Sequence, residues 1–313
     1  MNFLHVGYPK CASTLLQTQY FTPTNGFINL AEDPDWKIFI ENQLLSAQSS
    51  YYFSQPPEFS IPENLKQCMV GLSSENFLDG VQLVDFKLAL ERWKALYPDT
   101  KVLIIIRKQD DLVYSHYIQY VRAGYFRGID SYLREIMWNS QQSFWGRLYF
   151  DRIYEITRDI FDQVLVMPFE MISSFDQFIK TLNNFFGVSA ETRNTIVRKS
   201  SSDLSHSMIR AMNIFLRYGY GKSHMSILAS GVVMSNLYKF NDIDGIDPAE
   251  RSIGRMRHKL INRMDRKFTM NFNNRQRFVN TYAQLFREKF SESNRRLEDT
   301  LQLELAKYKY PGL

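Results

Sequence analysis

The stretch that most restricts the fold of this chain is the apolar run from Lys101 to Arg107, which reads Lys-Val-Leu-Ile-Ile-Ile-Arg. Successive side chains of a strand point to opposite faces, so a run of five apolar residues makes both faces apolar. Such a strand is typical of a parallel sheet that lies between two layers of helices. The run therefore predicts an α/β protein with three layers, α/β/α, around a central parallel sheet.

Short apolar runs alternate with longer amphipathic segments through residues 1–187, which is the pattern of successive βα units. Pro98 and Gly187 follow two of the amphipathic segments and are typical of helix ends. We expect strands at about 3–7, 68–72, 101–107 and 163–168. We expect helices at about 13–22, 34–47, 83–97, 110–123, 143–160, 173–186 and 203–218, and a polar helix from about 272 to 306.

The segment after the first expected strand, residues 7–14, reads Gly-Tyr-Pro-Lys-Cys-Ala-Ser-Thr. Unpaired N–H groups and the positive end of the helix dipole meet where a helix begins, so this turn can bind an anion. Cys11 and Ala12 are small enough for the backbone to approach a phosphate. Ser13 and Thr14 offer hydroxyl donors, and Lys10 offers a positive charge. The alternative is an ordinary strand, turn and helix with an exposed lysine.

The usual triphosphate-binding loop, GxxxxGK[ST], is not matched, because no second glycine stands between Gly7 and Lys10. A second candidate phosphate site follows the strand that ends at Arg107, at the edge where α/β proteins bind ligands. Ser115 is expected about one turn into the next helix, from which it could grip the same phosphate as the Arg107 fork. The alternative for Arg107 is an ion pair with Asp110 or Asp111.

These segments resemble the PAPS-dependent sulfotransferases, which use 3′-phosphoadenosine 5′-phosphosulfate (PAPS). Residues 8–14 are similar to that family's 5′-phosphosulfate loop, usually Tyr-Pro-Lys-Ser-Gly-Thr-Thr, with Cys-Ala in place of Ser-Gly. Arg107 and Ser115 match the spacing of its 3′-phosphate site, where Gln109 replaces the usual proline. The resemblance, which extends over about residues 3–187, implies a P-loop NTPase-like sulfotransferase fold with extra C-terminal helices.

The resemblance implies that PAPS donates a sulfuryl group to a hydroxyl or amine of a small-molecule or carbohydrate acceptor, with PAP as the product and no metal. Nucleic acid is not expected as a partner. It also implies which residues bind the cofactor: Tyr8, Pro9, Lys10, Cys11, Ala12, Ser13, Thr14, Arg107, Ser115 and Arg257. The sequence does not identify the acceptor, because variable loops such as 46–66 and 219–260 would form the acceptor pocket. It does not indicate the oligomeric state either.

Three residues are the catalytic candidates. Lys10 would stabilise charge on the bridging oxygen of PAPS. In the resembling family the general base comes from the loop after the strand at 68–72, so Glu75 is our first candidate and His116 is held in reserve. Glu75 could instead cap a helix or be solvated, and His116 could be a helix-surface or core histidine.

Seven lysines and arginines lie between Arg251 and Lys267, and the chain has a net charge of +5. A solvated helix face is one interpretation of this segment. In the other, the segment closes over the 3′-phosphate of the cofactor through Arg257 or holds an acidic acceptor. Two further functions remain open: a P-loop kinase of small molecules, and a polyanion-binding protein without enzymatic activity.

We interpret the chain as one sulfotransferase domain, with a core at 1–187 that holds the cofactor site and a helical part at 188–313 that contains a variable loop, 219–260. The sequence has no apolar run of 18 residues, and its first expected strand begins almost at Met1. We therefore expect a cytoplasmic protein without a signal peptide or a transmembrane segment. Two cysteines are too few for a disulfide framework.

Overall fold

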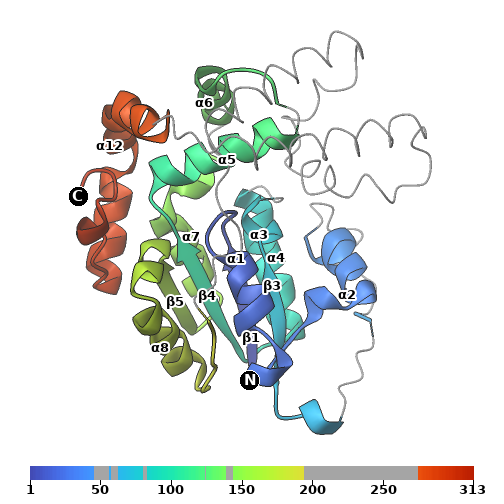
Figure 1. The fold of residues 1–313 in the computed structure, drawn as a ribbon. Coiled ribbons are helices and arrows are strands. Elements are labelled where there is room, and N and C mark those ends of the chain that lie inside the picture. The colour runs from blue at the N-terminus through green and yellow to red at the C-terminus, as the bar shows by residue number, and fades with distance from the viewer. Residues whose placement is uncertain (46–55, 58–62, 80–82, 124, 139–143, 194–273) are drawn as a thin grey trace, which may run out of the picture.

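The computed structural model describes residues 1–45, 56–57, 63–79, 83–123, 125–138, 144–193 and 274–313. At its centre is a parallel sheet of five strands in the order β2-β3-β1-β4-β5 (Figure 1). The strands are β1 (Asn2–Gly7), β2 (Phe27–Asn29), β3 (Met69–Ser74), β4 (Thr100–Ile106) and β5 (Gln163–Pro168). The four strands expected from the sequence are confirmed, and β2 is an additional edge strand of three residues.

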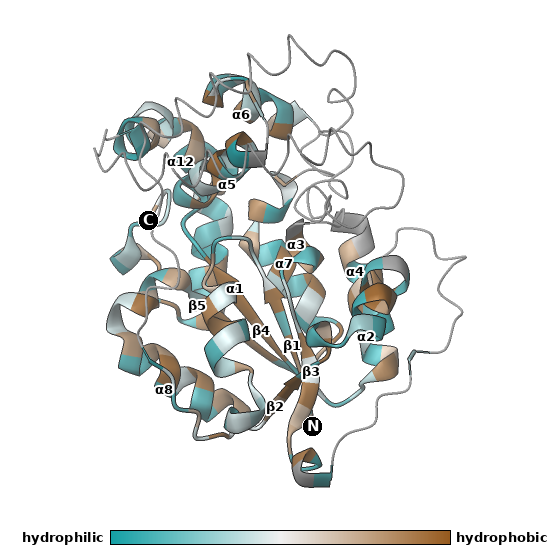
Figure 2. Cartoon of the chain, turned by 45° about the vertical axis from the view of Figure 1, so that its right-hand side comes forward, coloured by the Kyte–Doolittle hydropathy of each residue, from teal (hydrophilic) through white to brown (hydrophobic). Residues whose placement is uncertain are grey.

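Strand β4 is the apolar run from which the fold class was predicted. Its residues Val102–Ile106 are each no more than 1% exposed, and β1 and β5 pair with it on its two sides. Figure 2 shows the strands as the hydrophobic centre of the chain. The α/β fold with a central parallel sheet is therefore confirmed, since a strand is shielded from solvent on both faces only when helices cover both faces of its sheet.

Helices lie on both faces of this sheet and over the edge at which its strands end (Figures 1 and 2). The α-helices are α1 (Ser13–Leu15), α2 (Pro34–Phe39), α3 (Asn76–Asp79), α4 (Leu83–Leu96), α5 (Gln109–Ala123), α6 (Ile129–Trp138), α7 (Phe150–Arg158), α8 (Phe175–Phe186) and α12 (Asn274–Leu301). The π-helices η1 (Leu16–Tyr20) and η4 (Ile40–Leu44) continue α1 and α2. The 3-10 helices are η2 (Pro23–Asn25), η3 (Leu30–Glu32), η6 (Glu63–Leu65), η7 (Gly146–Leu148), η8 (Phe169–Ser174) and η9 (Ala306–Tyr308).

One face of the sheet is closed by packed aromatic rings. The Phe3 ring of β1 stacks on Phe21 at 4.6 Å and meets Phe27 and Phe186 edge to face. Such pairs are stabilising beyond the area they bury. Helix α8 ends at Gly187, whose φ of 75° is the left-handed C-terminal conformation expected of glycine at this position. This aromatic layer fixes η1, β2 and α8 on the face of β1 that carries Phe3.

Helix α12 lies far from the sheet in sequence but packs against α5 and α7. The Asp111 carboxylate of α5 is 3% exposed and accepts two hydrogen bonds from the Arg275 guanidinium, one of them from Nε at 2.6 Å. Burial by itself raises the pKa of Asp111, but the Arg275 hydrogen bond and nearby cations outweigh it, so the pKa lies below its usual value. This ion pair anchors the C-terminal helix above the end of β4.

The part of the chain that the structure describes contains no helix with the length and apolar character needed to cross a membrane. The expected helix at 203–218 and the basic segment at 251–267 lie outside the described residues. The expected polar helix at 272–306 is confirmed as α12, with bounds Asn274–Leu301.

Candidate functional site

The loop between β1 and α1 has an unusual backbone. Lys10 and Ala12 both adopt left-handed conformations, with φ of 65° and 61°, although neither is glycine. Such conformations cost on the order of 1–3 kcal/mol each and persist where the surrounding structure enforces them. Turns of this kind direct successive N–H groups into one concave surface, which is a common way to bind anions. Ala12 also stands where the resembling loop has glycine, and it keeps a backbone conformation that glycine favours.

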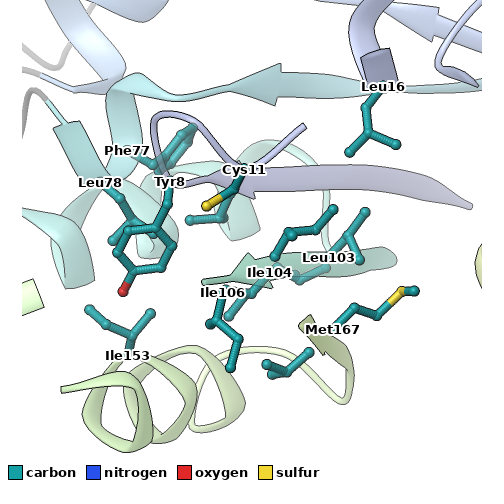
Figure 3. Packing of buried hydrophobic residues seen from close by; sticks show 14 of the residues in the cluster. Tyr8, Cys11, Leu16, Phe77, Leu78, Leu103, Ile104, Ile106, Ile153 and Met167 are labelled. Carbon is teal, nitrogen blue, oxygen red and sulfur yellow. The ribbon is translucent and has the colours of Figure 1, made fainter. Parts of the chain in front are cut away.

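Two residues of this loop anchor it to the hydrophobic core. Tyr8 and Cys11 are fully buried, and Figure 3 shows both side chains pointing into the apolar layer that contains Ile153 of α7. The Tyr8 hydroxyl donates a hydrogen bond to the Arg147 carbonyl, and burial raises the pKa of both the phenol and the Cys11 thiol. Both side chains therefore stay neutral and are buried in the core. The two residues could contact an anion only through their backbone N–H groups.

The remaining residues of the loop differ in exposure. Lys10 is exposed and Thr14 is half-buried, whereas Pro9 is buried. Ser13, at the first position of α1, is 3% exposed, and its hydroxyl donates a hydrogen bond to Glu75 Oε1. Glu75 follows the last residue of β3 and is half-buried. The structure thus brings a predicted phosphate-binding hydroxyl and the predicted general base into direct contact.

Arg107 lies against the same loop. Strands β1 and β4 are neighbours, so their ends meet at one edge of the sheet, with Gly7 paired to Ile105. The Arg107 guanidinium donates a hydrogen bond from Nη1 to the Lys10 carbonyl at 2.9 Å and lies 4.8 Å from the centre of the Phe169 ring. The two predicted phosphate-binding segments are therefore adjacent.

The alternative in which Arg107 pairs with Asp110 or Asp111 is wrong for the part of the chain that the structure describes. Asp111 pairs with Arg275 and, at 3.2 Å, with Lys108 Nζ. Burial and the neighbouring Asp111 charge raise the pKa of Asp110. Within the described residues the Arg107 guanidinium forms no ion pair, and Asp111 pairs with other cations instead.

The turn that follows Arg107 depends on two residues that sequence reasoning did not identify. Glu170, in η8 directly after β5, accepts a hydrogen bond from the Lys108 N–H at 3.1 Å. Its other oxygen accepts one from the Tyr310 hydroxyl at 2.9 Å. Burial raises the pKa of Tyr310 well above its usual value, so this phenol remains a donor. A carboxylate at the carboxyl end of a strand was the available signal for Glu170, but nothing local indicates Tyr310.

Ser115 and His116 lie farther along α5. That helix begins at Gln109, one residue before its expected start, and Ser115 lies nearly two turns into it rather than one. Ser115 is half-buried, and its hydroxyl has no hydrogen-bond partner among the described residues. His116 is 1% exposed, forms a hydrogen bond through Nδ1 with the Tyr132 hydroxyl, and stacks on the Phe144 ring at 3.9 Å. The His116 ring is thus surrounded by aromatic side chains. Its role as a reserve base stays a prediction.

The remaining predicted residue, Arg257, lies outside the described residues, as do the loop 219–260 and most of the segment 46–66. Among the side chains that the structure describes, no group of three or more His, Cys, Asp or Glu is arranged to hold a metal ion. The candidate site is therefore built from the loop 8–14, Glu75, and Arg107 with its turn.

Comparison with protein families finds no family model that matches this sequence, and no curated protein matches it. The structure is similar to that of a sulfotransferase from Alicyclobacillus acidocaldarius, with 19% identity, a TM-score of 0.43, and coverage of 73% of this chain and 98% of the other. It is also similar to a sulfotransferase domain from the curacin biosynthetic pathway, with 13% identity, a TM-score of 0.37, and coverage of 82% and 97%. At these values the similarities assign no residue role and no substrate to this chain.

Proposed function

We propose that this protein is a PAPS-dependent sulfotransferase that transfers a sulfuryl group to a hydroxyl or amine of an acceptor. The observation that carries the proposal is the hydrogen bond from Arg107 Nη1 to the Lys10 carbonyl. It joins, at one edge of the sheet, a loop suited to a 5′-phosphosulfate and an arginine suited to a second phosphate. Two phosphate sites on one nucleotide distinguish PAPS from a nucleoside monophosphate.

In this proposal the loop 8–14 binds the phosphosulfate through its N–H groups and the Ser13 hydroxyl, and Arg107 with Ser115 binds the 3′-phosphate. The acceptor oxygen attacks sulfur while the bond from sulfur to the bridging oxygen breaks. Glu75 takes the proton of the acceptor, and the exposed Lys10 ammonium stabilises the charge that develops on the leaving phosphate. Because the leaving group is a phosphate, positioning and electrostatics supply most of the rate enhancement.

Titration calorimetry tests the cofactor. We expect the protein to bind PAP in the absence of magnesium and to transfer labelled sulfate from PAPS in a screen of alcohols, phenols, sugars and amines. Binding of Mg-ATP without binding of PAP would contradict the proposal in favour of a small-molecule kinase. Strongly salt-dependent polyanion binding that survives Lys10→Ala, without sulfate transfer, would instead favour a polyanion-binding protein.

The base is tested with Glu75→Gln. The amide keeps the size of the side chain but cannot take a proton at neutral pH, so we expect kcat to fall on the order of a hundredfold or more while PAP affinity changes much less. Steady-state rates and calorimetry on the same preparation measure the two effects. An unchanged kcat would exclude Glu75 as the base.

A further inference from the structure

The histidine in the first strand has an incomplete set of hydrogen bonds. His5 is fully buried in β1, and its Nδ1 lies 2.8 Å from the Ser73 hydroxyl of β3. Its Nε2 is also buried and has no hydrogen-bond partner among the described residues. Burial lowers the pKa of His5 to about 3, so the ring is neutral near pH 7, with one nitrogen a donor and the other an acceptor. A buried polar atom without a partner calls for an explanation.

The unpartnered nitrogen faces the candidate site. A Cβ built on Gly7 would lie 3.2 Å from His5 Cε1, 3.5 Å from His5 Nε2 and 3.6 Å from Glu75 Cγ. His5 Nε2 and the Glu75 side chain therefore flank the same side of Gly7, no farther apart than the sum of the last two distances. The register agrees, because His5 pairs with Ser73, and Glu75 follows Ser73 by two residues toward the same face. One water, or a change of the Glu75 rotamer, would connect the two groups.

Glu75 exchanges one hydrogen-bond donor when an anion binds. Its Oε1 now accepts the Ser13 hydroxyl hydrogen bond, and Ser13 is one of the donors that the proposed function assigns to the phosphosulfate. When that hydroxyl turns to the anion, the carboxylate loses a donor and gains a like charge nearby. We propose that His5 is a positioning residue for Glu75: its Nε2–H replaces the Ser13 hydroxyl, directly or through one water, and holds the carboxylate toward the acceptor.

This inference rests on the proposed function and assigns a tautomer. With the proton on Nε2, Nδ1 accepts a hydrogen bond from the Ser73 hydroxyl, which agrees with the 2.8 Å separation. Ser73 therefore fixes the ring and its tautomer, and Glu75 uses the other nitrogen. The transferred proton goes to Glu75, and His5 stays neutral throughout.

Two substitutions separate the roles of the two nitrogens. In His5→Asn the amide can keep the bond with Ser73 but does not reach the Nε2 position, whereas in His5→Gln the longer amide reaches it. We expect His5→Asn to lower kcat ten- to a hundredfold with little change in the KM for PAPS, and His5→Gln to recover much of the loss. In a Glu75→Gln background His5→Asn should have no further effect on kcat, because its effect acts through Glu75.

A measurement without turnover gives the second readout. With 15N-labelled histidine, the Nε2 resonance of His5, identified by its loss in His5→Asn among the five histidines, should shift when PAP is added to the wild-type protein and stay in place in Glu75→Gln. Two results would overturn the role of His5 without affecting the proposed function. One is the same resonance shift in both proteins, and the other is an equal loss of kcat from His5→Asn in both backgrounds. Absence of PAP binding to the wild type would overturn the proposed function and this inference together.

Discussion

Lys10→Ala is expected to lower kcat on the order of a thousandfold, the size of effect seen when a group that stabilises transition-state charge is removed. The Lys10 side chain is exposed, so its loss leaves no cavity in the core. Alanine tolerates the left-handed backbone at this position no worse than lysine, and Arg107 binds the Lys10 carbonyl, which the substitution keeps. The effect should therefore fall on catalysis and leave the thermal midpoint of unfolding unchanged.

Initial rates with labelled PAPS, PAP titration and a thermal melt test this expectation together. Lys180→Ala is the matched control, because it removes the same charge from an exposed position on α8, outside the candidate site. It should keep the wild-type kcat. A Lys10→Ala protein that retained more than about a tenth of the wild-type kcat would show that another group stabilises the leaving oxygen.

Arg107→Ala is expected to weaken PAP binding on the order of a hundredfold, because a guanidinium that binds a phosphate contributes charge-assisted hydrogen bonds worth several kcal/mol. The substitution also removes the Nη1 bond to the Lys10 carbonyl and the contact with Phe169, so it loosens the loop as well. The two consequences can be separated by the ligand. Adenosine 5′-phosphate, which lacks the 3′-phosphate, should lose much less affinity than PAP.

Calorimetry with both ligands provides the comparison. Arg107→Lys is the matched variant: it keeps the charge without the planar fork, so its PAP affinity should fall between the wild type and Arg107→Ala. Equal losses for PAP and adenosine 5′-phosphate would mean that Arg107 acts by bracing the loop and does not bind the 3′-phosphate.

The main strands and the long helices were predictable because each carries its own signal. The apolar run of β4 indicated a strand covered on both faces, and α12 was expected close to its observed bounds. Strand β2 was missed because three residues, Phe27–Asn29, are too short to show a period. Helix α7 was expected from about 143 but begins at Phe150, because the 3-10 helix η7 precedes it.

Within the candidate site, the sequence indicated the loop 8–14 and Arg107, because each joins a strand end to the start of a helix and carries suitable donors. It could not show that Ser13 binds Glu75, that Glu170 joins the turn after Arg107 to Tyr310, or that His5 faces Glu75. The three pairs are 62, 140 and 70 positions apart in the sequence, so no local pattern connects their members.

By itself, then, the sequence determined the parallel sheet, the loop after its first strand and the residue types able to bind phosphate, since all of these follow from local periodicity and local chemistry. Only the tertiary structure decided which side chains meet. The order β3-β1-β4 places the ends of three strands side by side, and it is this adjacency that brings Glu75 and Arg107 to opposite sides of one loop. Strand order depends on the packing of the whole chain, so no short segment encodes it.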